Sequence, residues 1–182
     1  YSNNINSVNP AFTQVSGYKF RQPERIFYNP YDQNQVWVTS FGNGVKVGYT
    51  IPPKISLNLT YGIEAMWNGS VQVRDTVKIF LRNNMFPFNA IDSVKTYLSN
   101  SGNAIVNFDN ASNGSYFIQV IHRNAMETWS SSANAFSKGT VLNYDFTTTQ
   151  SQAFGNNQVL NLNRWCAFSG DVNNDGIIDA SD

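Results

Sequence analysis

Charged side chains are scarce in this chain, and the few that occur balance one another. Only 13% of the residues are Asp, Glu, Lys or Arg, well below the roughly 25% of an average globular protein. Twelve basic and twelve acidic residues give a formal net charge of zero. Because binding to nucleic-acid phosphates depends on a basic surface, we expect no nucleic-acid partner.

Cysteine and histidine each occur once. With Cys166 alone, no intrachain disulfide is possible. Since Cys166 lies between Trp165 and Ala167, we expect it to pack as a small hydrophobic residue. A single histidine, His122, excludes a metal site built from several histidines.

Long apolar runs are also missing. A membrane-spanning helix needs about 18 consecutive apolar residues or more, and the chain has no such run. The sequence opens at Tyr1 without Met, and we expect no signal peptide within it. Since it also ends inside a motif, we expect it to be a piece of a larger exported precursor.

What the chain does contain is a series of short runs rich in Val, Ile, Thr, Tyr and Phe. Their apolar residues alternate with polar ones, which is the signature of β-strands, and no stretch keeps the 3.6-residue period of a helix. The sequence therefore predicts an all-β fold, with strands at residues 25–28, 35–39, 45–49, 55–60, 76–81, 93–98, 104–108, 115–121 and 141–146.

Residues 1–50 form a segment of their own. A strand leads to a turn at Asn29-Pro30, and the next strand ends in Phe41-Gly-Asn-Gly44. This run resembles the closing blade of a sialidase-repeat β-propeller. Because one blade cannot bury its faces alone, the resemblance implies either a lost upstream propeller or packing on the following domain. A simple β-hairpin with an Asn-Gly turn is the alternative.

Pro52-Pro53 marks the expected boundary of a second domain, residues 51–169, with enough strands for an antiparallel β-sandwich of the immunoglobulin or prealbumin kind. A strand at 75–82 precedes an Asp-Ser-containing strand at 92–97, and turns at Gly102 and Asn113-Gly114 follow. This order resembles the prealbumin-like sandwiches of Cna-B and carboxypeptidase-regulatory modules. The resemblance implies a module that spaces and presents other domains.

The last thirteen residues, 170–182, carry the clearest chemistry in the chain. Oxygen-bearing side chains occupy loop positions one, three, five, nine and twelve, position seven offers its backbone carbonyl, and Gly176 stands at position six, where a calcium loop turns. Ca²⁺ takes six to eight oxygen ligands. The spacing therefore predicts one Ca²⁺ site made by Asp171, Asn173, Asp175, Ile177, Asp179 and Asp182.

Two features distinguish this loop from the usual EF-hand, which closes with a bidentate Glu at position twelve. Asp182 closes it here, and residues 164–169 are strand-like where a helix would enter. Both features, with the lead-in Ser169-Gly170, resemble the first calcium repeat of a type I dockerin. That family binds a cohesin through the helices of two repeats. The resemblance here covers the calcium ligands only, so cohesin binding is not carried over. We expect Ile178 to point away from the ion into apolar surroundings; a solvated acidic turn is the alternative.

Motifs of common enzymes are missing from the sequence. Glycoside hydrolysis needs two carboxyl groups about 5–9 Å apart, but Glu24, Glu64 and Glu127 lie in separate segments. No Gly-x-Ser-x-Gly elbow, phosphate-binding glycine loop or His-Glu-x-x-His pattern occurs. We therefore expect a chain that is not an enzyme.

Aromatic residues could bind carbohydrate if they lay on an open face. Most of the four tryptophans fall in phase with apolar neighbours, so we expect at least three to pack in the core. Trp67 lies in the most loop-like context and is the best candidate for exposure.

The segment that begins at His122 is the densest cluster of polar and aromatic residues. We expect Arg123 to pair with Glu127 across a turn at Asn124-Ala125. Trp129 would then fill the core, and His122 would make a hydrogen bond near the sandwich edge. The alternative for this cluster is a ligand groove.

Neutral polar surfaces of this kind are common in secreted bacterial β-proteins and in self-associating surface layers. Millimolar calcium outside the cell also suits a weak loop. We therefore expect a secreted or cell-surface structural module. Its partners would be other domains or chains of an extracellular assembly, including copies of itself in a filament or lattice. The alternative is a carbohydrate-binding accessory module of a secreted glycoside hydrolase, with glycans as partners.

Overall fold

The computed structural model describes residues 23–42, 44–50 and 53–182, and there the prediction of an all-β fold is confirmed. The chain divides into two compact units, residues 1–53 and 54–182. Within the described residues the helical elements are three single 3-10 turns, η1 (Glu64–Met66), η2 (Gln150–Gln152) and η3 (Phe154–Asn156). None of the described helices is both long enough and apolar enough to span a lipid bilayer.

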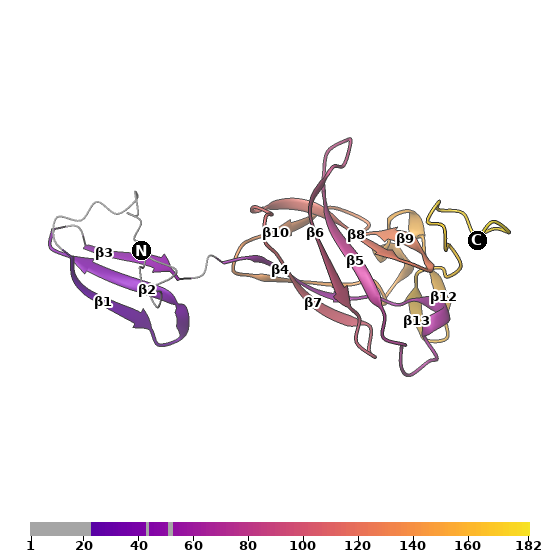
Figure 1. Ribbon diagram of the computed structural model, residues 1–182, viewed down its shortest axis with the longest axis horizontal. Coiled ribbons are helices and arrows are strands. Elements are labelled where there is room, and N and C mark those ends of the chain that lie inside the picture. Colours follow the sequence, from indigo (N-terminus) through magenta and orange to yellow (C-terminus); the bar gives the residue numbers. More distant parts are fainter. Residues whose placement is uncertain (1–22, 43, 51–52) are drawn as a thin grey trace, which may run out of the picture. The chain divides into compact units, whose positions relative to one another are not determined.

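The first unit contains one antiparallel sheet of three strands, β1 (Pro23–Asn29), β2 (Asp32–Ser40) and β3 (Gly44–Tyr49) (Figure 1). The predicted turn at Asn29-Pro30 is confirmed, and the Tyr31 backbone N–H donates to Asn29 Oδ1 over 2.9 Å. Asn suits such a turn because its side chain bonds to its own backbone two residues on. The assignment of this sheet to a propeller blade stays a prediction.

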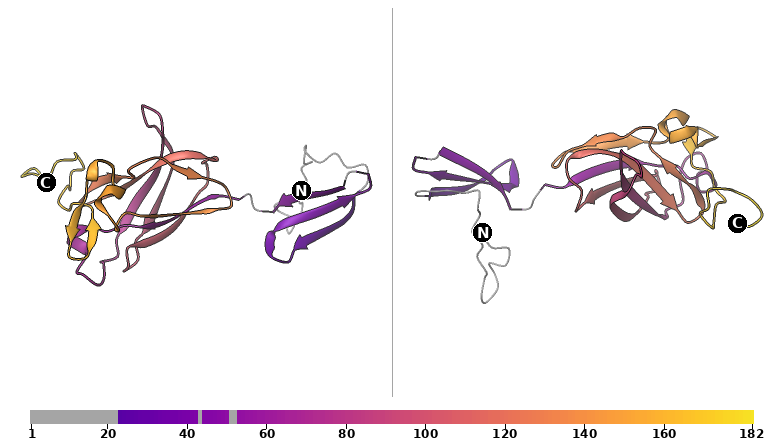
Figure 2. Two further views of the ribbon diagram at one scale, coloured as in Figure 1. Left: turned by 180° about the vertical axis from the view of Figure 1, so that it is seen from behind. Right: turned by 90° about the horizontal axis from the view of Figure 1, so that it is seen from above.

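The second unit is a β-sandwich built on two main sheets (Figures 1 and 2). The larger sheet has the strand order β10-β8-β5-β6, with β9 pairing β8 beside β10. Its strands are β5 (Thr76–Asn83), β6 (Ala90–Tyr97), β8 (Gly114–His122), β9 (Ala125–Trp129) and β10 (Asn134–Phe136).

The smaller sheet has the order β11-β4-β7, with β4 (Ile55–Thr60), β7 (Asn103–Phe108) and β11 (Val141–Asp145). A two-stranded ribbon is formed by β12 (Val159–Asn161) and β13 (Arg164–Cys166), which pair with each other and with no strand of either sheet. Among the strand pairs of the described residues, β11 with β4 is parallel, which was not predicted, and the others are antiparallel.

The core forms because apolar residues alternate along the strands that face each other. In β4 the buried residues are Ile55, Leu57 and Leu59, all inaccessible to solvent, and β5 and β7 follow the same alternation. In β8 the core residues Ile118 and Val120 also alternate, but Gln119 between them is buried as well. A period of two places these side chains on one face of each sheet. Each fully buried side chain of this size contributes about 1.5–3 kcal/mol relative to an exposed one, so the facing sheets hold together through one continuous apolar cluster.

Two further buried residues, Tyr61 and Cys166, carry a polar group. Tyr61 follows β4, is fully buried, and its hydroxyl lies 2.9 Å from Thr128 Oγ1. Cys166 is buried as predicted, and burial raises the pKa of its thiol to about 11. A thiol with that pKa stays protonated at neutral pH and packs as a hydrophobic residue.

The turn between β6 and β7 depends on Gly102, which adopts φ +80°. Its carbonyl accepts the Tyr61 backbone N–H over 2.9 Å, and an added Cβ would lie 2.6 Å from the Tyr61 carbonyl oxygen. The turn therefore requires both the left-handed backbone that glycine tolerates and the space that its missing side chain leaves.

We expect Gly102→Ala to lower the free energy of unfolding by about 3 kcal/mol, since it adds a backbone clash to left-handed strain. Gly155→Ala is the matched control, because Gly155 has φ +66° and open space around it; it should lose only the strain of about 1–2 kcal/mol. Chemical unfolding of both variants measures the difference, and equal losses would show that the contact with Tyr61 is unimportant.

Candidate metal site and the neighbouring pocket

The candidate calcium loop is attached to the sandwich by a strand-like lead-in, residues 164–169. Ala167 donates its backbone N–H to Gly62 over 2.9 Å, and the Phe168 carbonyl accepts the Met126 N–H over 2.9 Å. Ser169 then forms an antiparallel bridge with Ala125 at the start of β9. The lead-in therefore runs beside β9, and the loop begins where that strand begins.

Asp171, the first candidate ligand, is buried with 1% of its surface exposed. Its Oδ1 accepts the backbone N–H of Asp175 over 3.1 Å, and its Oδ2 accepts that of Gly176 over 3.1 Å. Gly176 has φ +82°, the left-handed conformation that glycine adopts without a steric penalty. These contacts fold positions one to six of the loop around the Asp171 carboxylate.

Asp182, the twelfth position, closes the loop. Its Oδ1 accepts the Val172 N–H over 3.0 Å, and its Oδ2 accepts the Asp179 N–H over 2.9 Å. Asp179 in turn accepts the Ser181 N–H over 2.7 Å. The Ser181 hydroxyl also donates to Asp179 Oδ1, and these two hydrogen bonds, the one from the hydroxyl above all, lower the pKa of Asp179. The last candidate ligand thus lies close to the backbone of the second position, and the loop is folded back on itself.

The donor set suits Ca²⁺ in its chemistry. Asp171, Asp175, Asp179 and Asp182 supply carboxylate oxygens, Asn173 an amide oxygen and Ile177 a backbone carbonyl, all of them hard oxygen ligands. An ionised carboxylate has about four lone-pair sites, so Asp171 can accept two N–H groups and still bind a cation.

The carboxylates of the loop are separated in space. Across the part of the chain that the structure describes, no three acidic, histidine or cysteine side chains gather closely enough to hold a metal ion. Instead, Asn173 donates its amide N–H to Asp175 Oδ2 over 3.1 Å, and Asp175 Oδ1 accepts the Ile177 N–H over 2.9 Å. The donor types and their spacing in the sequence suit calcium, but three carboxylates do not gather at one point, and the ion stays a prediction.

Ile178 does not reach apolar surroundings, contrary to the sequence expectation. It remains 44% exposed, and its contact is with Gly170, where an added Cβ would lie 2.9 Å from Ile178 Cγ2. The loop is thus joined to the sandwich by backbone hydrogen bonds, such as the one that the Gly170 N–H donates to the Asn124 carbonyl over 3.2 Å.

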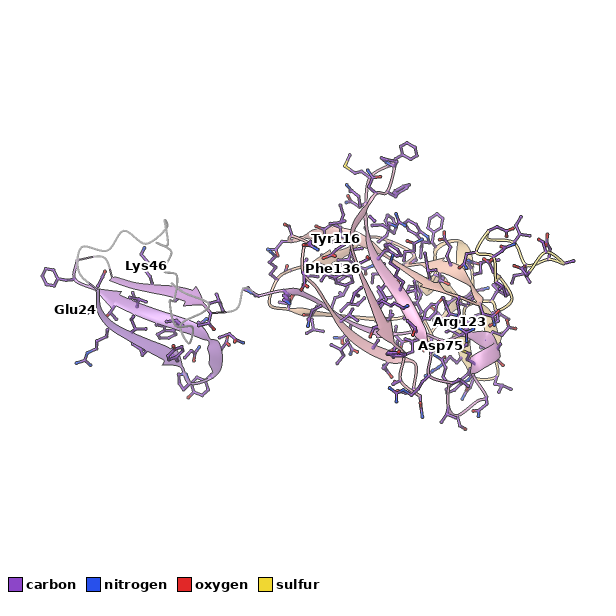
Figure 3. All side chains as sticks on the ribbon, viewed as in Figure 1. Glu24, Lys46, Asp75, Tyr116, Arg123 and Phe136 are labelled. Carbon is purple, nitrogen blue, oxygen red and sulfur yellow. The ribbon has the colours of Figure 1, made fainter. Side chains whose placement is uncertain are left out.

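The predicted pairing of Arg123 with Glu127 is wrong. Arg123 donates from Nε and Nη2 to Asp75 Oδ2 over 3.0 and 2.8 Å, and Figure 3 shows the two side chains together. Glu127 on β9 makes no pair with Arg123; its carboxylate accepts hydrogen bonds from the side chains of Gln119 and Trp129. Ala125 and Thr128 are the buried residues of β9 and Glu127 is exposed; this departs from simple alternation, and the pairing with β8 shifts register between Val120 and His122.

His122 is buried beside Asp75. The Asn124 N–H donates to His122 Nδ1 over 3.2 Å, so Nδ1 is the acceptor and Nε2, 3.3 Å from Asp75 Oδ2, carries the proton. Burial lowers the pKa of His122 and outweighs the neighbouring carboxylate, which acts in the opposite direction. The expected hydrogen bond of His122 is present, and the imidazole is neutral.

The tryptophans also differ from expectation. Trp67 is half-buried, donates from Nε1 to Asn163 Oδ1 over 3.1 Å, and has the Arg164 guanidinium 4.0 Å from its ring centroid. Because Arg164 covers a face of the ring, Trp67 is a poorer surface for a sugar than its loop position suggested. Trp129 does not fill the core, and is half-buried at the surface.

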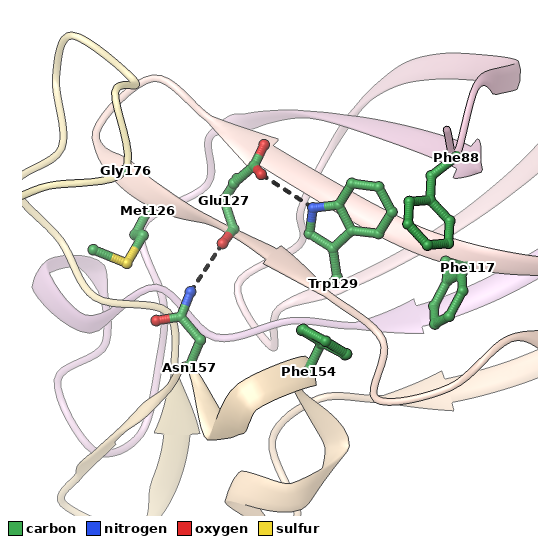
Figure 4. A pocket seen from close by; sticks show the side chains of 8 residues that line it. All are labelled: Phe88, Phe117, Met126, Glu127, Trp129, Phe154, Asn157 and Gly176. Carbon is green, nitrogen blue, oxygen red and sulfur yellow. Dashed lines mark hydrogen bonds between the residues drawn. The ribbon is translucent and has the colours of Figure 1, made fainter. Parts of the chain in front are cut away.

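Trp129 lines an open pocket of about 430 Å³ (Figure 4). Its walls come from distant parts of the chain: Phe88, Phe117, Met126, Glu127, Trp129, Phe154, Asn157 and Gly176. Sequence reasoning missed the phenylalanines, which no local motif brings together. One signal was available, since the run Met85-Phe-Pro-Phe88 is apolar where a hairpin loop is normally polar.

We expect the free energy of unfolding to fall as the pH is lowered from about 7.5 to 5.5. Because the folded pKa of His122 lies below the ordinary 6.5, the unfolded chain binds more protons below about pH 6.5, and stability is lost there. Asp75, whose pKa is lowered by the Thr76 N–H and by Arg123, loses its contribution only below about pH 4.

Chemical unfolding at several pH values measures this dependence. His122→Gln should be less stable overall but nearly flat between pH 7.5 and 5.5, because His122 is the one histidine of the sequence. The same slope in both proteins would mean that another group titrates.

Comparisons with protein-family models, with curated proteins and with solved structures found no match to this chain.

Proposed function

We propose that this chain is an exported, non-enzymatic β-sandwich module whose C-terminal loop, residues 170–182, binds one Ca²⁺. The observation that carries the proposal is the buried Asp171, whose carboxylate accepts the N–H groups of positions five and six. A carboxylate is rarely buried unless it is hydrogen-bonded, paired or bound to a metal. The spacing of the remaining oxygen donors, and the resemblance to a dockerin calcium repeat, add support.

Calcium would act on the stability of the tail. The four aspartates of the loop repel one another at neutral pH, and a bound Ca²⁺ supplies the positive charge that offsets this repulsion. Ser169 and Gly170 connect the loop directly to β9 through the bridge to Ala125 and the N–H donated to Asn124. An ion that binds only the folded loop stabilises this connection by mass action. It would therefore fix the direction in which the chain leaves the sandwich.

A structural or interaction role follows from the surface of the module. The low charge of the chain reduces electrostatic repulsion between copies. Edge strands also carry exposed apolar residues, with Tyr97 on β6 and Ile105 on β7 exposed to 66% and 72%. Such edges are sites where another chain can pair. The proposed partners are other domains or chains of an extracellular bacterial assembly, including copies of this chain in a filament or lattice, in a secreted or cell-surface protein.

A second candidate function, a carbohydrate-binding accessory module, is favoured by the pocket at Trp129. Ligand sites are concave, rich in aromatic side chains, and supplied with a few polar groups, and this pocket has all three traits. The two functions are compatible, because the residues that line the pocket include Gly176 of the loop but none of the six candidate calcium ligands.

Calorimetric titration should detect one Ca²⁺ per chain, with a Kd of about 10⁻⁴–10⁻³ M, the range of extracellular modules. Asp171→Asn and Asp182→Asn should each weaken binding at least about tenfold. Asp109→Asn is the matched control, since Asp109 is an exposed acid that pairs with Lys54 at 2.7 Å and lies outside the loop.

Hydrogen exchange provides the second measurement. Chelation of calcium should speed exchange in residues 170–182 and leave the strands of the sandwich unchanged. If calcium produced no heat, and its removal changed exchange nowhere in the loop, the solvated acidic turn would be the correct interpretation.

A further inference from the structure

The Trp129 ring is held at the surface by a polar network that runs beneath it. Its Nε1 donates to Glu127 Oε1 over 3.1 Å, and Gln119 Nε2 donates to Glu127 Oε2 over 2.6 Å. Arg82 Nε completes the network by donating to Gln119 Oε1 over 2.7 Å. Gln119 is buried with 2% exposure. Its two hydrogen bonds offset the cost of burying the amide, and they position the Glu127 carboxylate at the surface.

The neighbouring rings restrict Trp129 further. Phe88 and Phe117 make edge contacts with it, at centroid distances of 6.4 and 6.1 Å, and the Arg82 guanidinium lies 5.6 Å from its ring centroid. Arg82 thus occupies one side of the ring, while the ring also lines the open pocket. Figure 4 shows Trp129 between Glu127 and the two phenylalanines. A ring that is fixed before binding loses little entropy when a ligand stacks on it.

The chemistry of the pocket suits an uncharged ligand that has both apolar faces and hydroxyl groups. Aromatic walls accept the C–H faces of a sugar ring, and the Glu127 carboxylate can accept hydroxyl hydrogens through lone pairs beyond those used by Gln119 and Trp129. Glu127 is the charged residue among those that line the pocket, and Arg82, of opposite charge, lies nearby with its guanidinium 5.6 Å from the Trp129 ring centroid. Its volume of about 430 Å³ lies within the roughly 300–1,000 Å³ of small-ligand sites.

A protein surface fits this pocket less well. A stable protein interface buries about 800 Å² on each partner, and it would have to cover the exposed Glu127 carboxylate. Burying that charge against apolar side chains is unfavourable. Sugar hydroxyls can instead donate to the carboxylate the hydrogen bonds that water donates before binding.

We propose that the pocket around Trp129 binds a neutral oligosaccharide, with a sugar ring stacked on Trp129 and Phe154 and its hydroxyl groups bonded to Glu127 and Asn157. Phe154 belongs to η3, is 64% exposed and forms part of the pocket wall. Asn157 is fixed at the rim because its Nδ2 donates to the Glu127 carbonyl over 3.1 Å.

Binding of the sugar depends on calcium, and this part of the proposal rests on the proposed calcium site. Gly176, the sixth residue of the loop, lines the pocket, and its N–H is held by the buried Asp171. Calcium that orders the loop therefore also orders this part of the pocket wall. By linkage, an ion that strengthens sugar binding is itself bound more tightly when sugar is present.

The test is calorimetric titration of the whole chain with neutral tetrasaccharides, namely cellotetraose, xylotetraose, maltotetraose and chitotetraose, in millimolar calcium. At least one should bind, and Trp129→Ala should weaken that binding at least about tenfold. Phe154→Ala should also weaken sugar binding. Because Phe154 is exposed, this substitution should leave the packing of the core unchanged. Tyr97→Ala is the control, because it removes an exposed aromatic ring at the end of β6, whereas the pocket residue Phe88 precedes the start of that strand. This variant should bind the sugar as the unaltered chain does.

Three results would overturn the carbohydrate site: no binding of any sugar at millimolar concentration, equal binding by the Trp129 and Phe154 variants, or a self-association that those variants abolish. The last result would assign the pocket to a second copy of the chain.

The sugar titration is repeated with a chelator to test the calcium dependence. Removal of calcium should weaken sugar binding several-fold. If calcium binds but leaves the sugar affinity unchanged, the coupling is wrong. If calcium does not bind while the sugar does, the proposed calcium function fails and the carbohydrate site stands.

Discussion

The apolar alternation of β4, β5, β7 and β8 is the constraint on which the rest of the second unit depends. Each strand turns one face inward, and the two sheets share a single buried cluster. Because a shift of register by one residue would move every apolar side chain to the solvent face, the core also determines where the polar residues of these strands emerge. Gln119 and Arg82 occupy their places beneath Trp129 because Ile118, Val120 and Leu81 are fixed in the core.

The arrangement at β8 brings the candidate sites together. One edge of β8 pairs with β5 along its length, and the other edge is shared between β10 near its beginning and β9 near its end. The lead-in to the C-terminal loop then continues the pairing at the start of β9, through the Ala125–Ser169 bridge. A loop that the sequence places far from the aromatic residues thus becomes part of the wall of their pocket.

Polar groups near the hairpin of β8 and β9 are satisfied in two separate networks. In the first network His122 bonds to Asp75 and to the Asn124 backbone, and Arg123 reaches the same carboxylate. In the second network Gln119 joins Arg82 to Glu127. Buried polar groups are costly unless they are hydrogen-bonded, so both networks make the hairpin geometry specific. The first supports the fold, while the second positions a carboxylate and an indole at the surface.

The sequence by itself determined the fold class, nine of the strands and the spacing of the candidate oxygen donors, because alternation and residue spacing are local properties of a short segment. It could not determine pairing between distant segments. The parallel pairing of β11 with β4 joins strands more than eighty residues apart (Tyr144 faces Leu59 in register), and Arg123 bonds to an aspartate 48 positions away rather than to the nearby Glu127. Trp129 was expected in the core because its apolar character suggests burial. Only the tertiary structure decided that it lies on the outer face of β9, since the inward positions of that strand belong to Ala125 and Thr128.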